Sequence, residues 1–505
     1  MRHKDRVNKS KWKKKIPAFL FLLITTIGIF LRTYQYLMGR SLWEDEAHLA
    51  LNFMSRDFSQ LLEPLDFIQM APVLFLMITK AITTVFGYNE LAFRFLPFIL
   101  SILTLPLFYF IVFELTKKRS ISLMAFAIFS INITPCYFAA ELKPYALDLA
   151  VFLTMVFLAV TSHKNIAPNR TKWLLIAGSI SLFLSYISVV VLACIGAYEV
   201  YQWFLNKKFN TSYIKVFLFW GIAFLINYTF FISNNGNRGN QVIQGFWSTA
   251  FMPLNVFSID FIQFIKTQYN EVFFELLVNL PKTWGLKYIL PFILLLAGVT
   301  IVLRRNYKLL FFALLPIIIH LLLSAFNIYP FYYRLILYLL PAFILFFAYG
   351  VGVIVSFIGS KIHYSVSYSA VLVLTAFFIT SSIQQFPLWY REIGPSIHFI
   401  NENYAGANVY ITTPLNTYTY YDKVGKVKEK NYTSISWNLS PERFENKVIN
   451  EKEPFLLLVN DYNFKPVINH LENKNRVIDK FEYKDYGVWV ISPDISTNRI
   501  IKIDD

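Results

Sequence analysis

Long apolar runs separated by short polar segments fill the first three quarters of the chain. A helix that crosses a bilayer needs about 20 consecutive apolar residues, and the first run, Ile16 to about Leu37, has that length. The pattern then repeats, so the chain is expected to be a polytopic α-helical membrane protein with about eleven spans. The predicted spans after the first cover residues 91–115, 120–140, 146–160, 173–205 (two spans), 214–232, 288–303, 309–326, 335–357 and 366–383.

The polar segments between these runs predict the orientation of the spans. Residues 1–15 carry eight Lys or Arg against one Asp, and basic segments next to a span stay in the cytoplasm. The apolar stretch 71–87 is short and has Lys80 at its middle. Counting it as a span would place the basic cluster 117–119 outside, so we predict that it lies in the interface, within a first outer loop.

The pattern changes at about residue 384, where membrane-length runs stop. Short apolar strands at 408–412, 455–460, 477–481 and 487–492 alternate there with helical stretches at 415–422, 441–451 and 464–473, which favours a small α/β domain. An odd number of spans places this domain outside. The predicted organisation is a basic N-terminus (1–15), a transmembrane domain (16–384) with large outer loops at 38–90 and 233–286, and an extracytoplasmic domain (385–505).

Composition narrows the class of protein further. Of the 505 residues, 56% are hydrophobic and only 15% are charged, whereas soluble domains have about 25% charged residues. The net charge of +16 is spread over short loops, so it reports topology and predicts no nucleic-acid partner. The two cysteines, Cys136 and Cys194, form no metal or disulfide framework, and no phosphate-loop, dinucleotide or zinc-protease motif is present.

Three consecutive acids, Glu44, Asp45 and Glu46, follow the first span. A carboxylate at a membrane needs a partner or water, and taken alone the triplet is also consistent with a solvated acidic loop. The predicted topology brings further polar and aromatic residues to the same outer side. They are Arg94, Glu141, Lys143, Tyr145, Tyr332, Tyr333 and Arg334.

This set of side chains fits a phosphate and a hydroxyl better than a metal. Arg and Lys bind phosphate oxygens, and a carboxylate can take the proton of a hydroxyl nucleophile. The scattered histidines predict no metal cluster, while a divalent cation beside Asp45 and Glu46 stays open. Arg94 and Arg334 taken singly are also consistent with snorkelling at helix ends, and the Glu141–Lys143 turn with a solvated surface.

Four short motifs resemble one enzyme superfamily: residues 42–47 (LWEDEA), 71–72 (AP), 90–97 (ELAFRFLP) and 141–145 (ELKPY). They are similar to motifs of the integral-membrane GT-C glycosyltransferases, in the branch of protein O-mannosyltransferase-like and lipid A aminoarabinose transferase-like proteins of bacteria. The resemblance is most specific over residues 16–160. One departure is that aminoarabinose transferases have Lys before the proline that matches Pro72, where this chain has Ala71.

The resemblance implies a GT-C-like fold in the bacterial inner membrane, with the active site on the outer side. It implies transfer of a sugar from a polyprenyl-phosphate donor to a glycan, lipid or protein hydroxyl, with inversion. The family's catalytic acid pair maps to Asp45 and Glu46, with Asp45 as general base. Arg94, Lys143 and Arg334 are then candidates for the donor phosphate, and Glu141, Tyr145, Tyr332 and Tyr333 for orienting sugar or acceptor.

Two alternatives to a glycosyltransferase are a transporter or lipid flippase and a non-catalytic relative. A transporter or lipid flippase would show ionisable residues at mid-span and an internal repeat, whereas the charges here lie at predicted outer helix ends. A non-catalytic relative would be favoured by loss of the acid at position 45, which is present.

Overall fold

A computed structural model shows two compact units. Unit 1 comprises residues 1–37, 58–81 and 94–387, and unit 2 comprises residues 38–57, 82–93 and 388–505. Each is considered by itself. The residues whose structure is described are 2–161, 167–207, 211–233, 245, 247–272, 293, 297, 300, 306–361, 366–388, 391–412, 415–428, 431–436, 438–460, 464–483 and 486–493.

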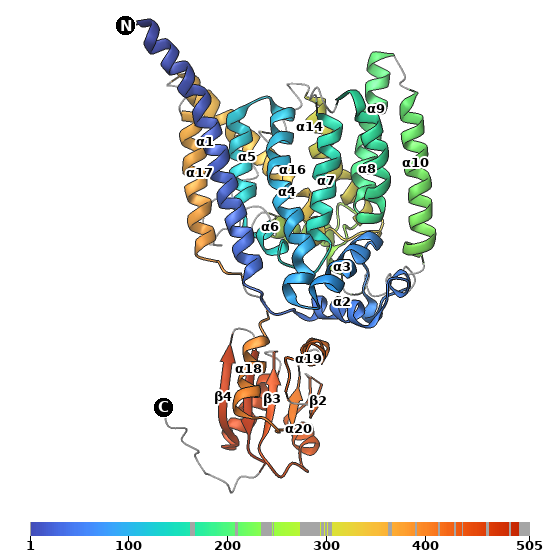
Figure 1. Cartoon of the computed structure of the whole chain (residues 1–505), viewed down its shortest axis with the longest axis vertical. Coiled ribbons are helices and arrows are strands. Elements are labelled where there is room, and N and C mark those ends of the chain that lie inside the picture. The colour runs from blue at the N-terminus through green and yellow to red at the C-terminus, as the bar shows by residue number, and fades with distance from the viewer. Residues whose placement is uncertain are drawn as a thin grey trace. The chain divides into compact units, whose positions relative to one another are not determined.

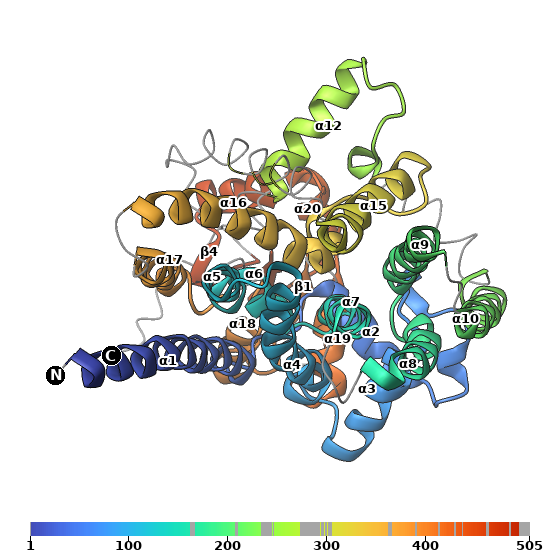
Figure 2. The ribbon, with the colours of Figure 1, turned by 90° about the horizontal axis from the view of Figure 1, so that it is seen from above.

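Unit 1 is a bundle of long helices that run side by side (Figure 1). α5 packs against α1, α16 and α17 and is buried along most of its length, as expected for a helix that is apolar all round; Figure 2 shows it between these three helices. The helices are α1 (Arg2–Leu37), α4 (Glu90–Thr116), α5 (Arg119–Ile131), α6 (Ile133–Phe138), α7 (Tyr145–Val160), α8 (Arg170–Leu184), α9 (Ser188–Asn206), α10 (Ser212–Asn227), α12 (Ile259–Asn270), α14 (Tyr307–Leu309), α15 (Leu315–Ala325), α16 (Leu340–Lys361) and α17 (Val366–Ile383).

Shorter helical segments extend or connect these helices. Two π-helical stretches, Tyr228–Ile232 and Leu310–Leu314, continue α10 and join α14 to α15. The 3-10 helices are Gln60–Leu62, Asp66–Ile68, Ala167–Asn169, Ser248–Ala250 and Tyr333–Leu339. The last of these leads directly into α16.

The protein is a polytopic helical membrane protein, as the hydropathy pattern predicts. In the described part of the chain, six helices are long and apolar enough to cross a membrane, and three shorter apolar helices accompany them. The predicted span 120–140 is divided at Asn132, whose side chain caps α6 by accepting from the Thr134 amide. Most of the predicted span 288–303 and parts of the loop 233–286 lie outside the described residues, so the count of eleven stays a prediction.

Unit 2 is built on a five-stranded mixed sheet with the order β2-β1-β3-β5-β4. β1 is parallel to β2 and β3, while β5 is antiparallel to β3 and β4. All five residues of the central β3 are buried. The strands are β1 (Val409–Ile411), β2 (Tyr432–Ser434), β3 (Phe455–Val459), β4 (Val477–Tyr483) and β5 (Tyr486–Ile491), and the helices beside them are α18 (Gly394–Asn403), α19 (Leu415–Lys423), α20 (Pro441–Lys447) and α21 (Lys465–Asn473).

Most elements of this sheet domain are where the sequence predicts them. The four predicted strands are confirmed within about two residues, as are the helices at 415–422 and 464–473. The predicted helix 441–451 ends earlier, at Lys447. β2 and α18 are missed, because neither carries a clear apolar period.

Unit 2 also contains two segments from the first predicted outer loop. The first holds α2 (Glu44–Ser55), which packs against α19. The second holds the connection between α3 (Val73–Phe86) and α4. Glu90, the first residue of α4, contacts Lys426 of the C-terminal part at 2.7 Å. The acidic triplet and the C-terminal domain therefore belong to one compact body.

Candidate active site

The three acids of the first outer loop form the first turn of α2. Trp43, the residue before the helix, is extended, and the helix starts at Glu44. Negative charge at a helix N-terminus is favourable, because the unpaired amides of the first turn carry partial positive charge. The helix start therefore gives a local reason for three adjacent acids.

Glu46 is fully buried and forms an ion pair with Arg40, which is equally buried. The distance from Arg40 Nη1 to Glu46 Oε2 is 3.1 Å, and the Trp43 amide approaches the same oxygen at 3.5 Å. A buried ion pair is costly to break, because it leaves an uncompensated charge behind. Glu46 is therefore well suited to fix the start of α2.

Glu44 and Asp45 are half-buried and thus closer to solvent. Glu44 lies 3.9 Å from Arg391 and 4.0 Å from His48. Burial raises the pKa of Glu44, Arg391 lowers it, and the neighbouring Asp45 raises it. Of the two acids of the resembling pair, Asp45 and Glu46, only Asp45 is partly open to an incoming molecule.

The C-terminal part of the chain holds the acid-bearing segment by its backbone. The Ser41 amide donates to Glu392 at 3.0 Å, and the Leu42 amide donates to the Tyr421 hydroxyl at 2.9 Å. The Gly394 amide donates to the Ser41 hydroxyl at 2.9 Å. These contacts come from Glu392, from the first residue of α18 and from α19, and they fix the chain just before the acids.

A further contact from the C-terminal part of the chain holds α2 itself. Asn416 on α19 contacts the His48 imidazole at 2.9 Å. The Tyr421 hydroxyl stays protonated, because burial raises its pKa far above the usual value and Glu90 and Tyr420 add to this shift. It therefore acts as a neutral hydrogen-bonding group.

Unit 1 contains the predicted cations. Lys143 is buried in the turn between α6 and α7, where its amide donates to the Glu141 carbonyl at 2.8 Å. Its ammonium donates to the Gln69 side-chain oxygen at 2.6 Å. A buried ammonium at the end of a helix bundle is a group that can form a charge-assisted hydrogen bond to an anion.

Arg334 lies among aromatic rings. Its guanidinium is 5.9 Å from the Tyr145 ring and 5.2 Å from the Trp247 ring, both within the range of cation–π contacts. Tyr332 packs on Trp247 at 4.7 Å between ring centroids. Tyr333 packs on Phe138, which in turn contacts Tyr145, so the predicted tyrosines and Arg334 form one aromatic cluster.

Arg94 and Glu141 are both almost completely buried, at 1% exposure each. Arg94 lies one helical turn before Phe98, which packs with Tyr36 and Ala140 in one apolar cluster. Ala140 directly precedes Glu141 in the chain. Arg94, Glu141 and Lys143 therefore belong to the same end of the bundle.

The structure adds an acid that the sequence reasoning missed. Asp148 is buried on α7, and Ser185 donates a hydrogen bond to it at 2.6 Å. Tyr329 lies near Asp148. Burial raises the pKa of the Tyr329 hydroxyl far above its usual value, and the charges of Asp148, Tyr145 and Tyr186 raise it further, whereas the Arg334 guanidinium lowers it. An ionisable residue inside an apolar run marks a candidate site, and that signal could have singled out Asp148.

The predicted site residues fall into two groups. Asp45 and Glu46 lie in unit 2, and the other seven lie in unit 1, where Tyr145, Tyr332, Tyr333 and Arg334 cluster together. Gln69 and Trp247 join the second group without having been predicted. Within the described residues, no three His, Cys, Asp or Glu side chains are grouped as metal ligands would be.

Comparison with known proteins gives one kind of match. No family model matches the chain, and no curated protein matches it. Among solved structures, ArnT from Cupriavidus metallidurans in the apo state is 10% identical, with a TM-score of 0.48 over 97% of this chain and 99% of that chain. The same protein bound to undecaprenyl phosphate is 10% identical, with a TM-score of 0.42 over 94% and 97%. At these TM-scores the likeness carries no inference about the function of this chain.

Proposed function

We propose that this protein is a membrane glycosyltransferase that moves a sugar from a polyprenyl-phosphate carrier to an acceptor hydroxyl. The observation that carries the proposal is the group of cations and aromatic rings at one end of the bundle, above all the buried Lys143, which donates to Gln69, and the half-buried Arg334, which lies beside the rings of Tyr145 and Trp247. Cations can bind the phosphate of the carrier through charge-assisted hydrogen bonds, and aromatic rings can pack against the sugar. The motifs that resemble GT-C glycosyltransferases include this Lys143 and Tyr145.

In the proposed reaction Asp45 is the general base. The acceptor oxygen bonds to the anomeric carbon while its proton passes to the Asp45 carboxylate, and the bond from that carbon to the phosphate oxygen breaks. The attack comes from the face opposite the phosphate, so the configuration inverts. The lipid phosphate leaves with its negative charge, and Lys143, Arg334 and Arg94 stabilise it electrostatically.

The other predicted residues have supporting roles in this proposal. Glu46 positions the start of α2 through Arg40 and takes no part in proton transfer. Glu141, Tyr145, Tyr332 and Tyr333 orient the sugar or the acceptor. We further propose that this chemistry takes place on the outer side of a bacterial inner membrane.

Replacement of Asp45 by Asn tests the proposal. The amide keeps the size and loses the basicity, so transfer should fall at least about a hundredfold, while donor binding is retained. The measurement is mass spectrometry of lipids, glycans and proteins from cells that carry either form. Glu44→Gln is the matched control, since it removes the adjacent charge and should leave transfer nearly unchanged.

Replacement of Arg334 by Ala should instead weaken binding of the donor, because it removes a cation from the phosphate. Polyprenyl phosphate binding to the purified full-length protein measures this effect. Transfer that survives Asp45→Asn would contradict the assignment of the base. Translocation of a lipid across vesicle membranes without sugar transfer would favour a flippase, in which Asp148 would lie on the pathway.

A further inference from the structure

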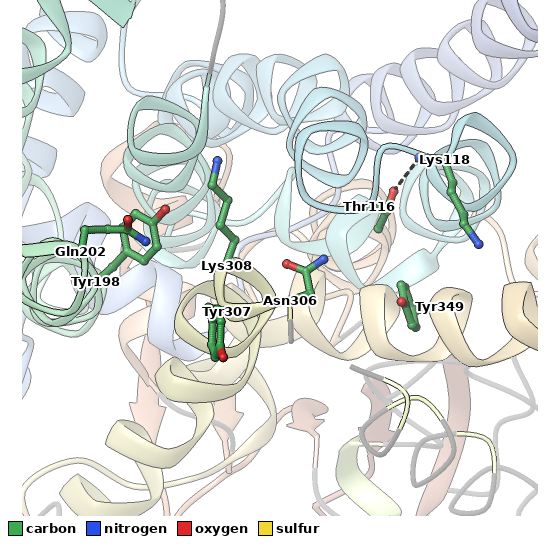
Figure 3. A pocket seen from close by; sticks show the side chains of 8 residues that line it. All are labelled: Thr116, Lys118, Tyr198, Gln202, Asn306, Tyr307, Lys308 and Tyr349. Atoms are coloured by element: carbon green, nitrogen blue, oxygen red, sulfur yellow. Dashed lines mark hydrogen bonds between the residues drawn. The ribbon is translucent and has the colours of Figure 1, made fainter. Parts of the chain in front are cut away.

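A polar cavity of about 480 Å³ lies in unit 1 at the end of α4 far from the candidate donor site (Figure 3). α4 carries Arg94 near its start and ends at Thr116, so the two places are about 30 Å apart along the helix axis. The cavity is lined by Lys118, Tyr198, Gln202, Asn306, Tyr307 and Lys308, with one threonine and a further tyrosine.

The lining is rich in hydrogen-bond donors and cations. No carboxylate occurs among the described residues that line the cavity, whereas two lysine ammoniums and several hydroxyl and amide groups do. Lys308 forms no ion pair with any described residue. The nearest acids are already engaged, because Glu114 pairs with Lys117 and Glu199 pairs with Arg170 at 3.3 Å.

The walls of the cavity are fixed by contacts between elements. The Asn306 amide donates to the Leu115 carbonyl at 2.9 Å, which ties the start of α14 to the end of α4. The Tyr307 ring packs on Tyr201 of α9 at 5.1 Å. Tyr198, one turn earlier on α9, packs on Phe312 at 5.1 Å. A cavity held in this way is available to a ligand without rearrangement of the helices.

We propose that this cavity binds the phosphate of an anionic phospholipid headgroup. Lys308, in a lining without carboxylates and on the side of Tyr198 and Gln202 (Figure 3), complements a phosphate diester, and basic pockets between membrane helices are typical sites for such headgroups. The tyrosines suit the interface, where an aromatic ring meets both lipid and water. The site is separate from the proposed donor site and does not depend on the transferase activity.

Native mass spectrometry of the detergent-purified full-length protein tests the proposal, with phosphatidylglycerol as probe and phosphatidylcholine as the comparison lipid. We expect preferential binding of phosphatidylglycerol. Lys308→Gln should weaken it about tenfold, since it removes a charge-assisted hydrogen bond, and Lys118→Gln, on the opposite side of the cavity (Figure 3), should weaken it less. Lys308→Arg should keep it. Lys215→Gln, at an exposed lysine near the start of α10, is the matched control and should have no effect.

Three results would overturn the proposal. Equal binding of the two lipids would show that charge is not recognised. An equal loss with Lys215→Gln would show a general surface effect. Saturation by inorganic phosphate, with no gain from the lipid, would assign the cavity to a soluble phosphate compound.

Discussion

Asp45 and Glu46 are neighbours in the chain with different surroundings. Successive residues of a helix point about 100° apart, so one can face the protein while the other faces solvent. Glu46 is fully buried against Arg40, and Asp45 is half-buried. The Glu46 carboxylate, paired with Arg40, stabilises the folded structure, whereas the Asp45 carboxylate is accessible and suited to proton transfer.

Arg40→Met should destabilise unit 2 by about 3–5 kcal/mol, because Glu46 would remain buried without its partner. The double variant Arg40→Met/Glu46→Leu should recover most of this loss. Thermal unfolding of the full-length protein measures both effects. Glu46→Gln should keep transfer in the protein that remains folded; a well-folded Glu46→Gln variant without transfer would assign Glu46 to the chemistry.

Glu445 links stability of the sheet domain to pH. It accepts from Lys474 at 2.8 Å and contacts His470 at 3.1 Å, and these contacts, Lys474 first, hold its pKa below the usual value. A carboxyl group whose pKa is lower in the folded state stabilises the fold above its unfolded-state pKa. That contribution is lost as the pH falls through the folded-state value.

Glu445→Gln should therefore lower the stability around α20 and α21 at neutral pH by about 1 kcal/mol. The difference from the unchanged protein should vanish as the pH falls through the folded-state pKa of Glu445. Amide hydrogen exchange in the full-length protein measures it. Glu482→Gln, on the exposed side of β4, is the control; a difference that persists in acid would show that charge is not its cause.

At the scale of elements, α19 and the start of α18 with the residues just before it determine where α2 begins. Their side chains and amides contact Ser41, Leu42 and His48. α2 is only 12 residues long, and a helix of this length is marginal in isolation. The position of Asp45 therefore depends on the C-terminal domain, which gives that domain a role in the proposed reaction.

Tyr421→Phe tests this dependence. It removes the hydroxyl that accepts from the Leu42 amide and leaves a buried donor unpaired, at a cost of about 1–3 kcal/mol. We expect kcat to fall severalfold while KM for the donor changes little. Tyr410→Phe is the matched control, since its hydroxyl bonds to Glu451 elsewhere in the domain. An equal effect of both variants would contradict a specific positioning role.

At the scale of the whole molecule, the distribution of Lys and Arg predicts how the protein crosses the membrane. The basic residues 1–15 and the basic cluster 117–119 are both predicted to lie on the cytoplasmic side of the membrane. An odd number of spans then places the two ends of the chain on opposite sides. The proposed chemistry outside the cytoplasm depends on this arrangement.

Reporter fusions at Lys117 and at the C-terminus should be found inside and outside, respectively. Cysteines introduced at Ala71 and Asn89, on either side of α3, should both react with an impermeant reagent from outside. Reaction of only one of them would mean that α3 crosses the membrane. A cytoplasmic C-terminus would contradict the predicted topology and the proposed location of the site.

The sequence by itself determined the elements whose signal is local. Apolar runs predicted the spans, because burial in lipid acts on each helix separately. Short apolar runs predicted β3 and β5, which are buried along their whole length. The same local reading singled out Asp45, Lys143 and Arg334 as unusual polar residues beside apolar runs, while β2, a three-residue strand that is mostly exposed, carries almost no such signal.

Only the tertiary structure decided which of these residues meet. Leu42 and Tyr421 lie 379 positions apart, and no local periodicity reports a contact at that distance. The same holds for Lys143 on Gln69 and for Trp247 on Arg334. The burial of Glu46 beside an accessible Asp45 depends on Arg40 and on the elements that enclose it, because desolvation is set by everything that surrounds a charge and not by its neighbours in the chain.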